Sequence, residues 1–187
     1  GPENGAPRFH QYLTLMNPDP AADAAVRLTY HLLGGEVVTR AVTVAAGRRA
    51  TVALHEATGG GLGRDREMAV TVESLNGVAV VAERPAYFQY SAADAKGRTA
   101  AQRAAARARG IRDGATGLGA AAPRLVWYLA DIRTDVDARR RLQHDSFVTV
   151  FNPNPVATRL RLTFYARDGG PRLTREVTAP AGGPGGG

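Results

Sequence analysis

Four aspartates in the second half of the chain come nearest to the spacing of a metal site. Asp131, Asp135 and Asp137 follow closely on one another, and Asp145 lies a little further along. Several carboxylates together could surround a hard cation such as calcium. The stretch "DIRTDVDARRR" (131–141) also carries four arginines and no loop glycine, however. Ion pairing with these arginines is the favoured interpretation, and no metal site is predicted.

Other residues that could do chemistry lack the neighbours that catalysis requires. His55 and Glu56 adjoin, but no second histidine follows at the spacing of a zinc-protease helix. The glycine-rich stretch "TGGGLGRD" (58–65) lacks the Gly-Lys-Ser/Thr ending of a phosphate loop. The remaining candidates have neither ligand spacing nor a nucleophile-elbow context: His10, His31, His144, Ser74, Ser91 and Ser146. We therefore predict no enzyme activity and no cofactor.

The positive charge of the chain comes almost wholly from arginine. The formal net charge is +7, and Lys96 is the only lysine among the 187 residues. A basic surface attracts acidic polymers over long distances, but an arginine bias of the whole sequence explains the charge without a nucleic-acid site. Nucleic acid is therefore not the expected partner. The chain has no cysteine, and no apolar run approaches the roughly 20 residues that a membrane helix needs.

Two phrases of similar sequence lie far apart in the chain. "YLTLMNPDP" (12–20) and "FVTVFNPNP" (147–155) are separated by 135 positions. The match continues between "RLTYHLLGGEVVTRAVTVAAG" (27–47) and "RLTFYARDGGPRLTREVTAPAG" (161–182), with one inserted residue. The sequence therefore predicts an internal repeat.

Both copies have the alternation of β-strands. Apolar and polar residues alternate over 26–32 and again over 160–164, which predicts half-buried strands. Gly34-Gly35 and Gly169-Gly170 predict tight hairpins, while Asn-Pro ends a strand and turns the chain. Further strands are predicted at about 49–55, 67–74 and 78–88. The predicted fold class is all-β, an antiparallel immunoglobulin-like β-sandwich.

This pattern divides the chain into four parts. Residues 8–90 are predicted to form one nearly complete sandwich, 124–182 a partial second copy, and 183–187 a Gly/Pro-rich tail. Residues 91–123 are predicted to form an exposed connector. It would contain a short helix over 98–110, where alanine favours helix but no apolar stripe could dock it.

The connector holds the candidate anion-binding residues. They are Arg98, Arg103, Arg107, Arg109 and Arg112. These arginines could bind phosphate or an acidic cell-wall polymer, although a solvated linker is the favoured interpretation.

One arginine at a matching position in both copies suggests a structural ion pair. In the alternation of each strand, Arg40 and Arg175 fall on the same face as apolar residues that should point inward. An inward arginine needs a carboxylate partner, or it must extend its charged group to solvent at the edge of the sheet. Glu83 is the candidate partner of Arg40, and the alternative is that Arg40 reaches solvent at the sheet edge.

The order of these motifs resembles a tandem immunoglobulin-like repeat of secreted and surface-displayed bacterial proteins. The resemblance rests on "WYLAD" (127–131), "FVTVFNPNP" (147–155), "VTAPAG" (177–182), "VAERPAYFQY" (81–90) and the connector "DGATGLGAAAPRLVWYLAD" (113–131). It covers most of the chain. Two departures are Asp131-Ile132, where the family has Glu-Gly, and the lack of second-copy strands matching 49–88.

The resemblance implies a module without catalytic residues, located outside the cell or on its surface. A structural or adhesive role as stalk, spacer or display element is the leading expectation, with neighbouring repeats as partners. The alternative is a binding module for an acidic cell-wall polymer or glycan. It would use the arginine-rich connector and exposed aromatic residues such as Trp127 and Tyr128.

Overall fold

The computed structural model of the chain is all-β in the residues that it describes. These are 8–90, 111–129, 136–137, 142–143, 146, 148–166, 169–182 and 184–185. No helix occurs within these ranges, and the helix predicted over 98–110 lies outside them. The chain forms two compact units, the first made of 1–29, 39–66 and 70–119, and the second of 30–38, 67–69 and 120–187.

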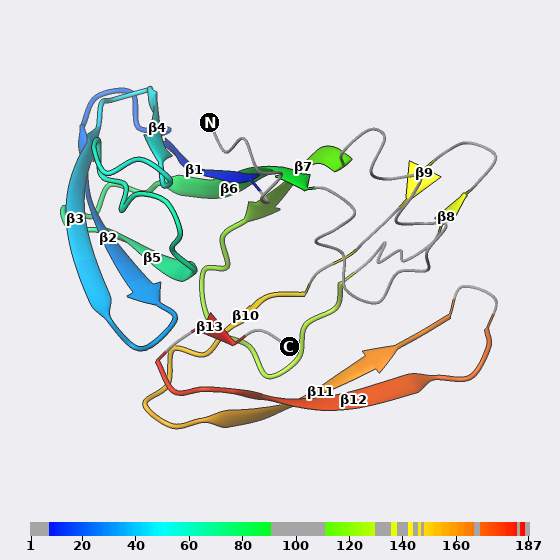
Figure 1. Cartoon of the computed structure of the whole chain (residues 1–187). Coiled ribbons are helices and arrows are strands. Elements are labelled where there is room, and N and C mark those ends of the chain that lie inside the picture. Colours follow the sequence, from blue (N-terminus) through cyan, green and yellow to red (C-terminus); the bar gives the residue numbers. More distant parts are fainter. Residues whose placement is uncertain are drawn as a thin grey trace. The chain divides into compact units, whose positions relative to one another are not determined.

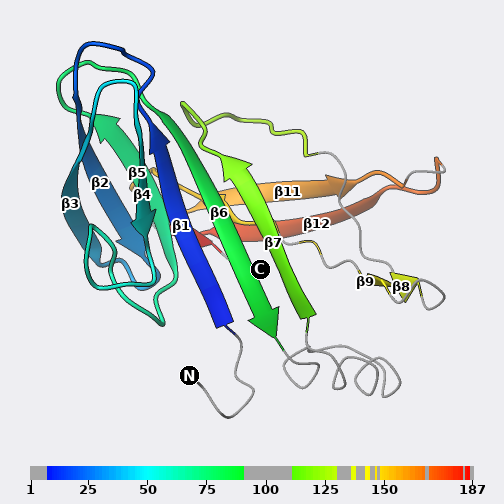
Figure 2. The same ribbon diagram turned by 90° about the horizontal axis from the view of Figure 1, so that it is seen from above.

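A four-stranded antiparallel sheet lies in the first unit (Figure 2). Its strands follow the order β4-β1-β6-β7: β1 (Arg8–Met16), β4 (Arg49–Ala53), β6 (Val81–Tyr90) and β7 (Ile111–Leu118). The central strand β1 pairs with both neighbours, so that Leu15 lies opposite Ala50 on β4 and Ala82 on β6.

Strand β7 lies within the range 91–123 that was expected to be a connector. Its sequence, "IRDGATGL", is rich in residues that disfavour strands and shows no alternation. The pairing with β6 requires only the backbone, and it places Gly114 opposite Tyr87. A Cβ at Gly114 would meet the Tyr87 ring at 3.0 Å, so the glycine makes room for that ring. Tertiary pairing rather than local propensity therefore makes this strand.

A three-stranded sheet has the order β3-β2-β5. Its strands draw residues from both units: β2 (Ala24–Leu32), β3 (Val37–Val44) and β5 (Met68–Ser74). The predicted hairpin between β2 and β3 is confirmed, with Gly34 and Gly35 at φ of 105° and 92°. The Leu75 N–H donates to the Ala25 carbonyl, and the Leu33 N–H donates to the Glu67 carbonyl. Strand β5 therefore runs antiparallel to β2.

Both sheets contribute buried side chains to the core. The alternation predicted for β2 is confirmed, because every second residue from Ala24 to Leu32 is buried. The four-stranded sheet adds Leu13 and Leu15 from β1 and Val52 from β4. Leu54, in the turn that follows β4, is also buried. This arrangement is consistent with a β-sandwich (Figure 1).

Asn17 joins three backbone segments of the first unit. Its side chain is fully buried. The Nδ2 group donates to the Ala22 carbonyl at 2.8 Å and to the Val44 carbonyl at 3.0 Å. The Oδ1 atom accepts from the Asp19 N–H at 3.0 Å. One amide thus ties the end of β1 to the start of β2 and the end of β3. We call this arrangement the Asn17 junction.

The second unit contains shorter sheets of two strands each. Its strands are β8 (Val136–Asp137), β9 (Leu142–Gln143), β10 (Val150–Phe151), β11 (Thr158–Phe164), β12 (Leu173–Ala179) and β13 (Pro184–Gly185). β11 and β12 form an antiparallel hairpin from Thr158↔Ala179 to Phe164↔Leu173. Strand β13 lies in the range expected to be a tail, where it pairs with β10.

Removing the Asn17 amide should destabilise the first unit. We expect Asn17→Ala to lower the free energy of unfolding by about 3 kcal/mol, because three hydrogen bonds are lost in a buried place. Urea unfolding followed by circular dichroism measures the change. The matched control is Asn76→Ala, which removes an exposed amide bonded to Asp23 and Ala25 and should cost about 1 kcal/mol. Equal losses in the two variants would contradict the importance of the junction.

Candidate functional site

The Asn17 junction has a counterpart 135 residues later, at Asn152. The Asn152 side chain is also buried. Its Nδ2 group lies 2.8 Å from the Val156 carbonyl, 3.4 Å from the Ala179 carbonyl and 3.1 Å from the Pro180 carbonyl. Its Oδ1 atom accepts from the Asn154 N–H at 3.1 Å. The Val156 and Ala179 carbonyls and the Asn154 N–H take the places of the Ala22 and Val44 carbonyls and the Asp19 N–H, and Pro180 is an additional partner. The second unit therefore contains the same kind of junction.

The backbone around the two junctions pairs in the same register. On β1 and β4, Leu15 lies opposite Ala50 and Met16 opposite Arg49. On β10 and β13, Val150 lies opposite Gly185 and Phe151 opposite Pro184. Every member of the second set follows its counterpart by 135 positions. The pairing thus recurs although Arg49 is replaced by a proline.

A further backbone bond closes each Asn-Pro turn. The Gly47 N–H donates to the Asp19 carbonyl at 2.7 Å, and the Gly182 N–H donates to the Asn154 carbonyl at 2.9 Å. Both glycines have positive φ, 62° and 58°, a conformation that glycine adopts without steric cost. The Ala-Gly that both copies share therefore serves backbone geometry.

The titratable group differs between the two junctions. The Asp19 carboxylate accepts from the Ala21 N–H at 2.8 Å and from the Ala22 N–H at 2.9 Å. These two donors hold the pKa of Asp19 below its usual value. At the matching position Asn154 has a neutral amide, which donates to Asn152 Oδ1 at 3.0 Å. The charge is thus a property of the first junction alone.

A cluster of ring side chains lies on the four-stranded sheet. His10 and Tyr12 are two residues apart on β1 and so share one face. The His55 ring lies 4.5 Å from the His10 ring and 5.0 Å from the Tyr12 ring, and the Tyr87 ring lies 6.0 Å from the Tyr12 ring. The histidines were predicted to have no ligand spacing, and their clustering was not predicted. The His-x-Tyr spacing of His10 and Tyr12 on a strand was a usable signal for it.

The ring cluster has the geometry of packed side chains. His55 Nδ1 lies 3.1 Å from the Gln11 carbonyl, so a hydrogen on Nδ1 is donated to that carbonyl. A structural zinc site needs four ligands. The described part of the chain contains no group of three or more His, Cys, Asp or Glu side chains that could hold a metal. Tyr12 meets both of its neighbours edge-on, which is a favoured packing of aromatic rings.

In the second unit, His31 and Tyr165 occupy matching positions of the two copies but have different surroundings. The His31 ring lies 4.7 Å from the Phe151 ring. Burial lowers the pKa of His31, because it disfavours the charged imidazolium. Tyr165 instead lies beneath the Arg172 guanidinium, 5.0 Å from the ring centroid. Neither arrangement is repeated in the other copy.

Most of the candidate anion-binding arginines, and most of the aspartates considered and set aside as a metal site, lie outside the described part of the chain. These are Arg98, Arg103, Arg107, Arg109, Asp131, Asp135 and Asp145. Arg112 lies on β7 opposite Gln89, and neither its side chain nor that of Asp137 is described. The anion-binding connector therefore stays a prediction.

The expectation that Arg40 faces inward is wrong. Its side chain is exposed on β3, an outer strand of its sheet, and Nη1 donates to the Thr39 carbonyl at 2.9 Å. Arg175 is also exposed and donates to the Thr174 carbonyl at 3.3 Å. At a sheet edge a long side chain can bring its charge to water. Glu83, the proposed partner of Arg40, lies on β6 in the other sheet.

Comparison of the chain with models of known protein families, with characterised proteins and with solved structures finds no match. Among the described residues no helix is long and apolar enough to cross a membrane.

The Asp19 carboxylate predicts a specific loss of stability in acid. Because its pKa is lowered by folding, its contribution is present above the ordinary value and is lost as the pH falls below about 4. We expect wild type to melt at a higher temperature than Asp19→Asn at pH 6, and the difference to shrink toward pH 2.5. Thermal melts across this range measure it. A difference that stays constant with pH would contradict the shifted pKa.

Proposed function

We propose that the chain is a non-catalytic structural or adhesive module built from tandem immunoglobulin-like sandwiches. The observation that carries this proposal is the recurrence of the Asn17 junction at Asn152, with the same strand register around it. Two copies of one junction suit a fold that is repeated along an elongated protein. On this proposal 8–90 is one module, and 124–182 belongs to a second module of the same kind.

What the copies share supports architecture rather than chemistry. The shared residues form turns and junctions, as Asn17 and Asn152 do. The reactive groups of the first copy are replaced in the second, where Asp145 and Phe147 stand at the positions of His10 and Tyr12. A repeated active site would need its side chains in both copies, whereas a repeated spacer needs only the backbone geometry.

The proposed location is outside the cell or on its surface. The motifs "WYLAD", "VAERPAYFQY" and the Asn-Pro strand end carry this part of the proposal through their resemblance to repeats of secreted bacterial proteins. Neighbouring modules of the same protein are the proposed partners. The connector with its helix over 98–110 would then be the link between modules.

Exposed aromatic residues favour glycan binding as a second candidate function. Trp127 and Tyr128 are 56% and 90% exposed, within an exposed apolar run from Leu125 to Leu129. Exposed apolar patches commonly mark interaction sites. The arginine-rich connector, which precedes this run in the sequence, would add attraction to an acidic wall polymer. Retention on insoluble cell-wall material that weakens with added salt and in Trp127→Ala would favour this second function over a passive spacer.

Protease treatment of intact source cells tests the proposed location. We expect an antibody against the first unit to lose its signal when protease is added outside intact cells, or to find the chain in the medium. A cytoplasmic enzyme, followed in the same samples, controls for lysis. Protection of the chain until the cells are broken would overturn the proposal.

A further inference from the structure

Strand β11 matches β2 in sequence but has fewer neighbours. β2 lies between β3 and β5 in its sheet. β11 pairs with β12, and the described residues include no strand on its other edge. An edge of this kind presents backbone N–H and C=O groups that another strand can pair with. In the part of the chain that the structure describes, β11 therefore has one strand neighbour where β2 has two.

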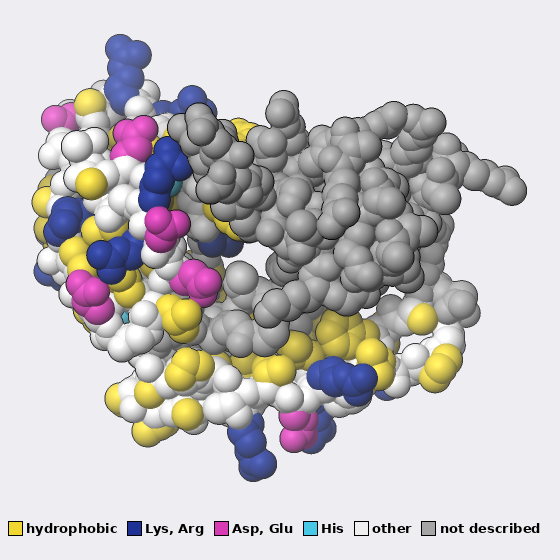
Figure 3. Space-filling model, viewed as in Figure 1, with side chains coloured by type: hydrophobic (Ala, Val, Ile, Leu, Met, Phe, Trp, Pro, Cys, Tyr) yellow, Lys and Arg dark blue, Asp and Glu magenta, His cyan; other side chains and the backbone are white. Residues whose placement is uncertain are grey.

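Side-chain burial shows the same difference. Val26 and Leu28 on β2 are buried, whereas Leu160 and Leu162 at the matching positions of β11 are only half-buried. Figure 3 shows apolar side chains along the β11–β12 hairpin. The residue types are the same or similar in the two strands, so the difference comes from what packs against them. The apolar face of β11 therefore has room for further cover.

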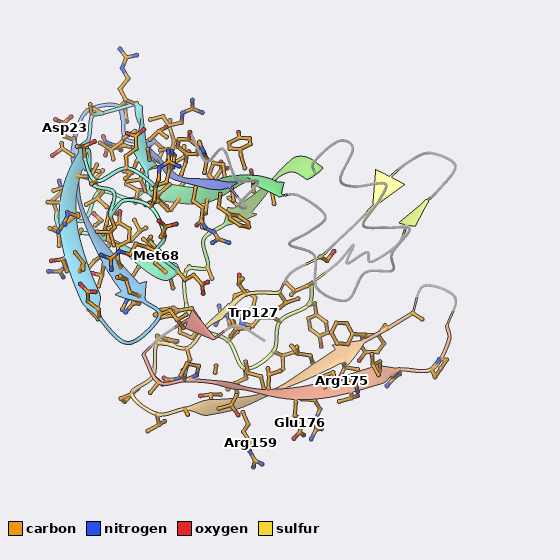
Figure 4. All side chains as sticks on the ribbon, in the orientation of Figure 1. Asp23, Met68, Trp127, Arg159, Arg175 and Glu176 are labelled. Carbon is orange, nitrogen blue, oxygen red and sulfur yellow. The ribbon has the colours of Figure 1, made fainter. Side chains whose placement is uncertain are left out.

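The arginines at matching positions also have different partners. On β2, Arg27 donates to Glu73 Oε2 of β5 from Nη2 at 2.7 Å and from Nε at 3.1 Å. On β11, Arg161 lies 3.6 Å from Glu176 Oε1 of β12, and the two side chains are 72% and 62% exposed. Glu176 and Arg159 extend from the same side of the hairpin (Figure 4). The contact of Arg161 is too long for a hydrogen bond, so a carboxylate on the open edge could compete for it.

We propose that the open edge of β11 binds an extended peptide strand with the pattern of β5. The strand would run antiparallel to β11, place apolar residues beside Leu160 and Leu162, and bring a carboxylate to Arg161. Such strand addition gives affinity through main-chain hydrogen bonds and specificity through alternate side chains. The inference rests on the proposed repeat, because the arrangement of β5 on β2 supplies the geometry.

The occupant is a separate peptide strand rather than β5 of a second copy of the chain. In each copy β5 is already held to β2 by the Arg27–Glu73 pair and by the bond from Leu75 N–H to Ala25 O. Asn76 adds two more bonds, to the Asp23 carbonyl and the Ala25 N–H. A second copy would have to break all of these to donate its β5. A separate peptide strand has no such bonds to break, so its binding to the edge of β11 has a smaller free-energy cost.

A synthetic peptide with the sequence of residues 67–76, "EMAVTVESLN", is the probe. It is added to the full chain, and backbone hydrogen exchange is followed by mass spectrometry. At ten times the dissociation constant we expect exchange over 158–164 to slow about tenfold. No slowing at a saturating concentration would overturn the proposal. Slowing confined to residues outside 158–164 would overturn it as well.

Charge reversal tests the role of Arg161. A peptide carrying Glu73→Lys should bind wild type about threefold more weakly, the size expected for an exposed ion pair. The variant Arg161→Glu should prefer that lysine peptide instead. The matched control Arg159→Glu changes an exposed arginine on the same face of β11 and should keep the wild-type preference. If both peptides bind all variants equally, the carboxylate has no role and the proposal is wrong.

Sedimentation without peptide identifies a competing occupant. If the chain dimerises and β11 is already protected in the dimer, a second copy fills the edge, which would also overturn the proposal. Both arginines replaced here are exposed, and circular dichroism checks that the variants fold. Protease accessibility on intact cells does not depend on β11, so failure of strand binding is distinguishable from failure of the proposed function.

Discussion

The Asn17 side chain donates from one buried nitrogen to the ends of two other strands. Pro18 and Pro20 have no N–H to donate. The side-chain amide of Asn17 supplies the donor for the carbonyls of Ala22 and Val44, beside the backbone bond from Gly47 to Asp19. Proline also holds the preceding asparagine in an extended conformation. The sheets of the first unit therefore depend on an amide at this position.

The second unit shows that the junction and its strand register do not require the same surrounding side chains. Asn152 keeps the bonds of Asn17, and β10 pairs with β13 in the register of β1 with β4. The surrounding side chains change from acid to amide and from arginine to proline. Backbone geometry is retained while charge and side-chain chemistry vary, which supports the proposed structural role. Among the described residues, β11 has one strand neighbour where β2 has two.

The features that could be predicted from sequence are those with local causes. The alternation of β2 and the Gly34-Gly35 hairpin follow from residue periodicity and from the φ values that glycine allows. Strand β7 was missed because only its pairing with β6 makes it a strand. An inward Arg40 was preferred over the solvent-exposed alternative because the alternation of a strand does not reveal which strand is outermost in a sheet. The connector helix remains a prediction.

The ring cluster was missed for a related reason. His10, His55 and Tyr87 are far apart in the chain and meet because β1 lies between β4 and β6. Strand order in a sheet is a tertiary property that one sequence does not reveal. The burial of Asn17 and Asn152 was also not predicted, since Asn-Pro was expected only to end a strand and turn the chain. Its bonds to distant strands arise from the fold.

Side-chain amide exchange measured by NMR tests the duplicated junction most directly. In 15N-labelled protein, the NH₂ protons of Asn17 and Asn152 should both exchange slowly with water, because both donate to carbonyls in buried places. Those of the exposed Asn154 should exchange faster and serve as the internal reference. Slow exchange at Asn17 together with fast exchange at Asn152 would contradict the claim that one junction organises both units.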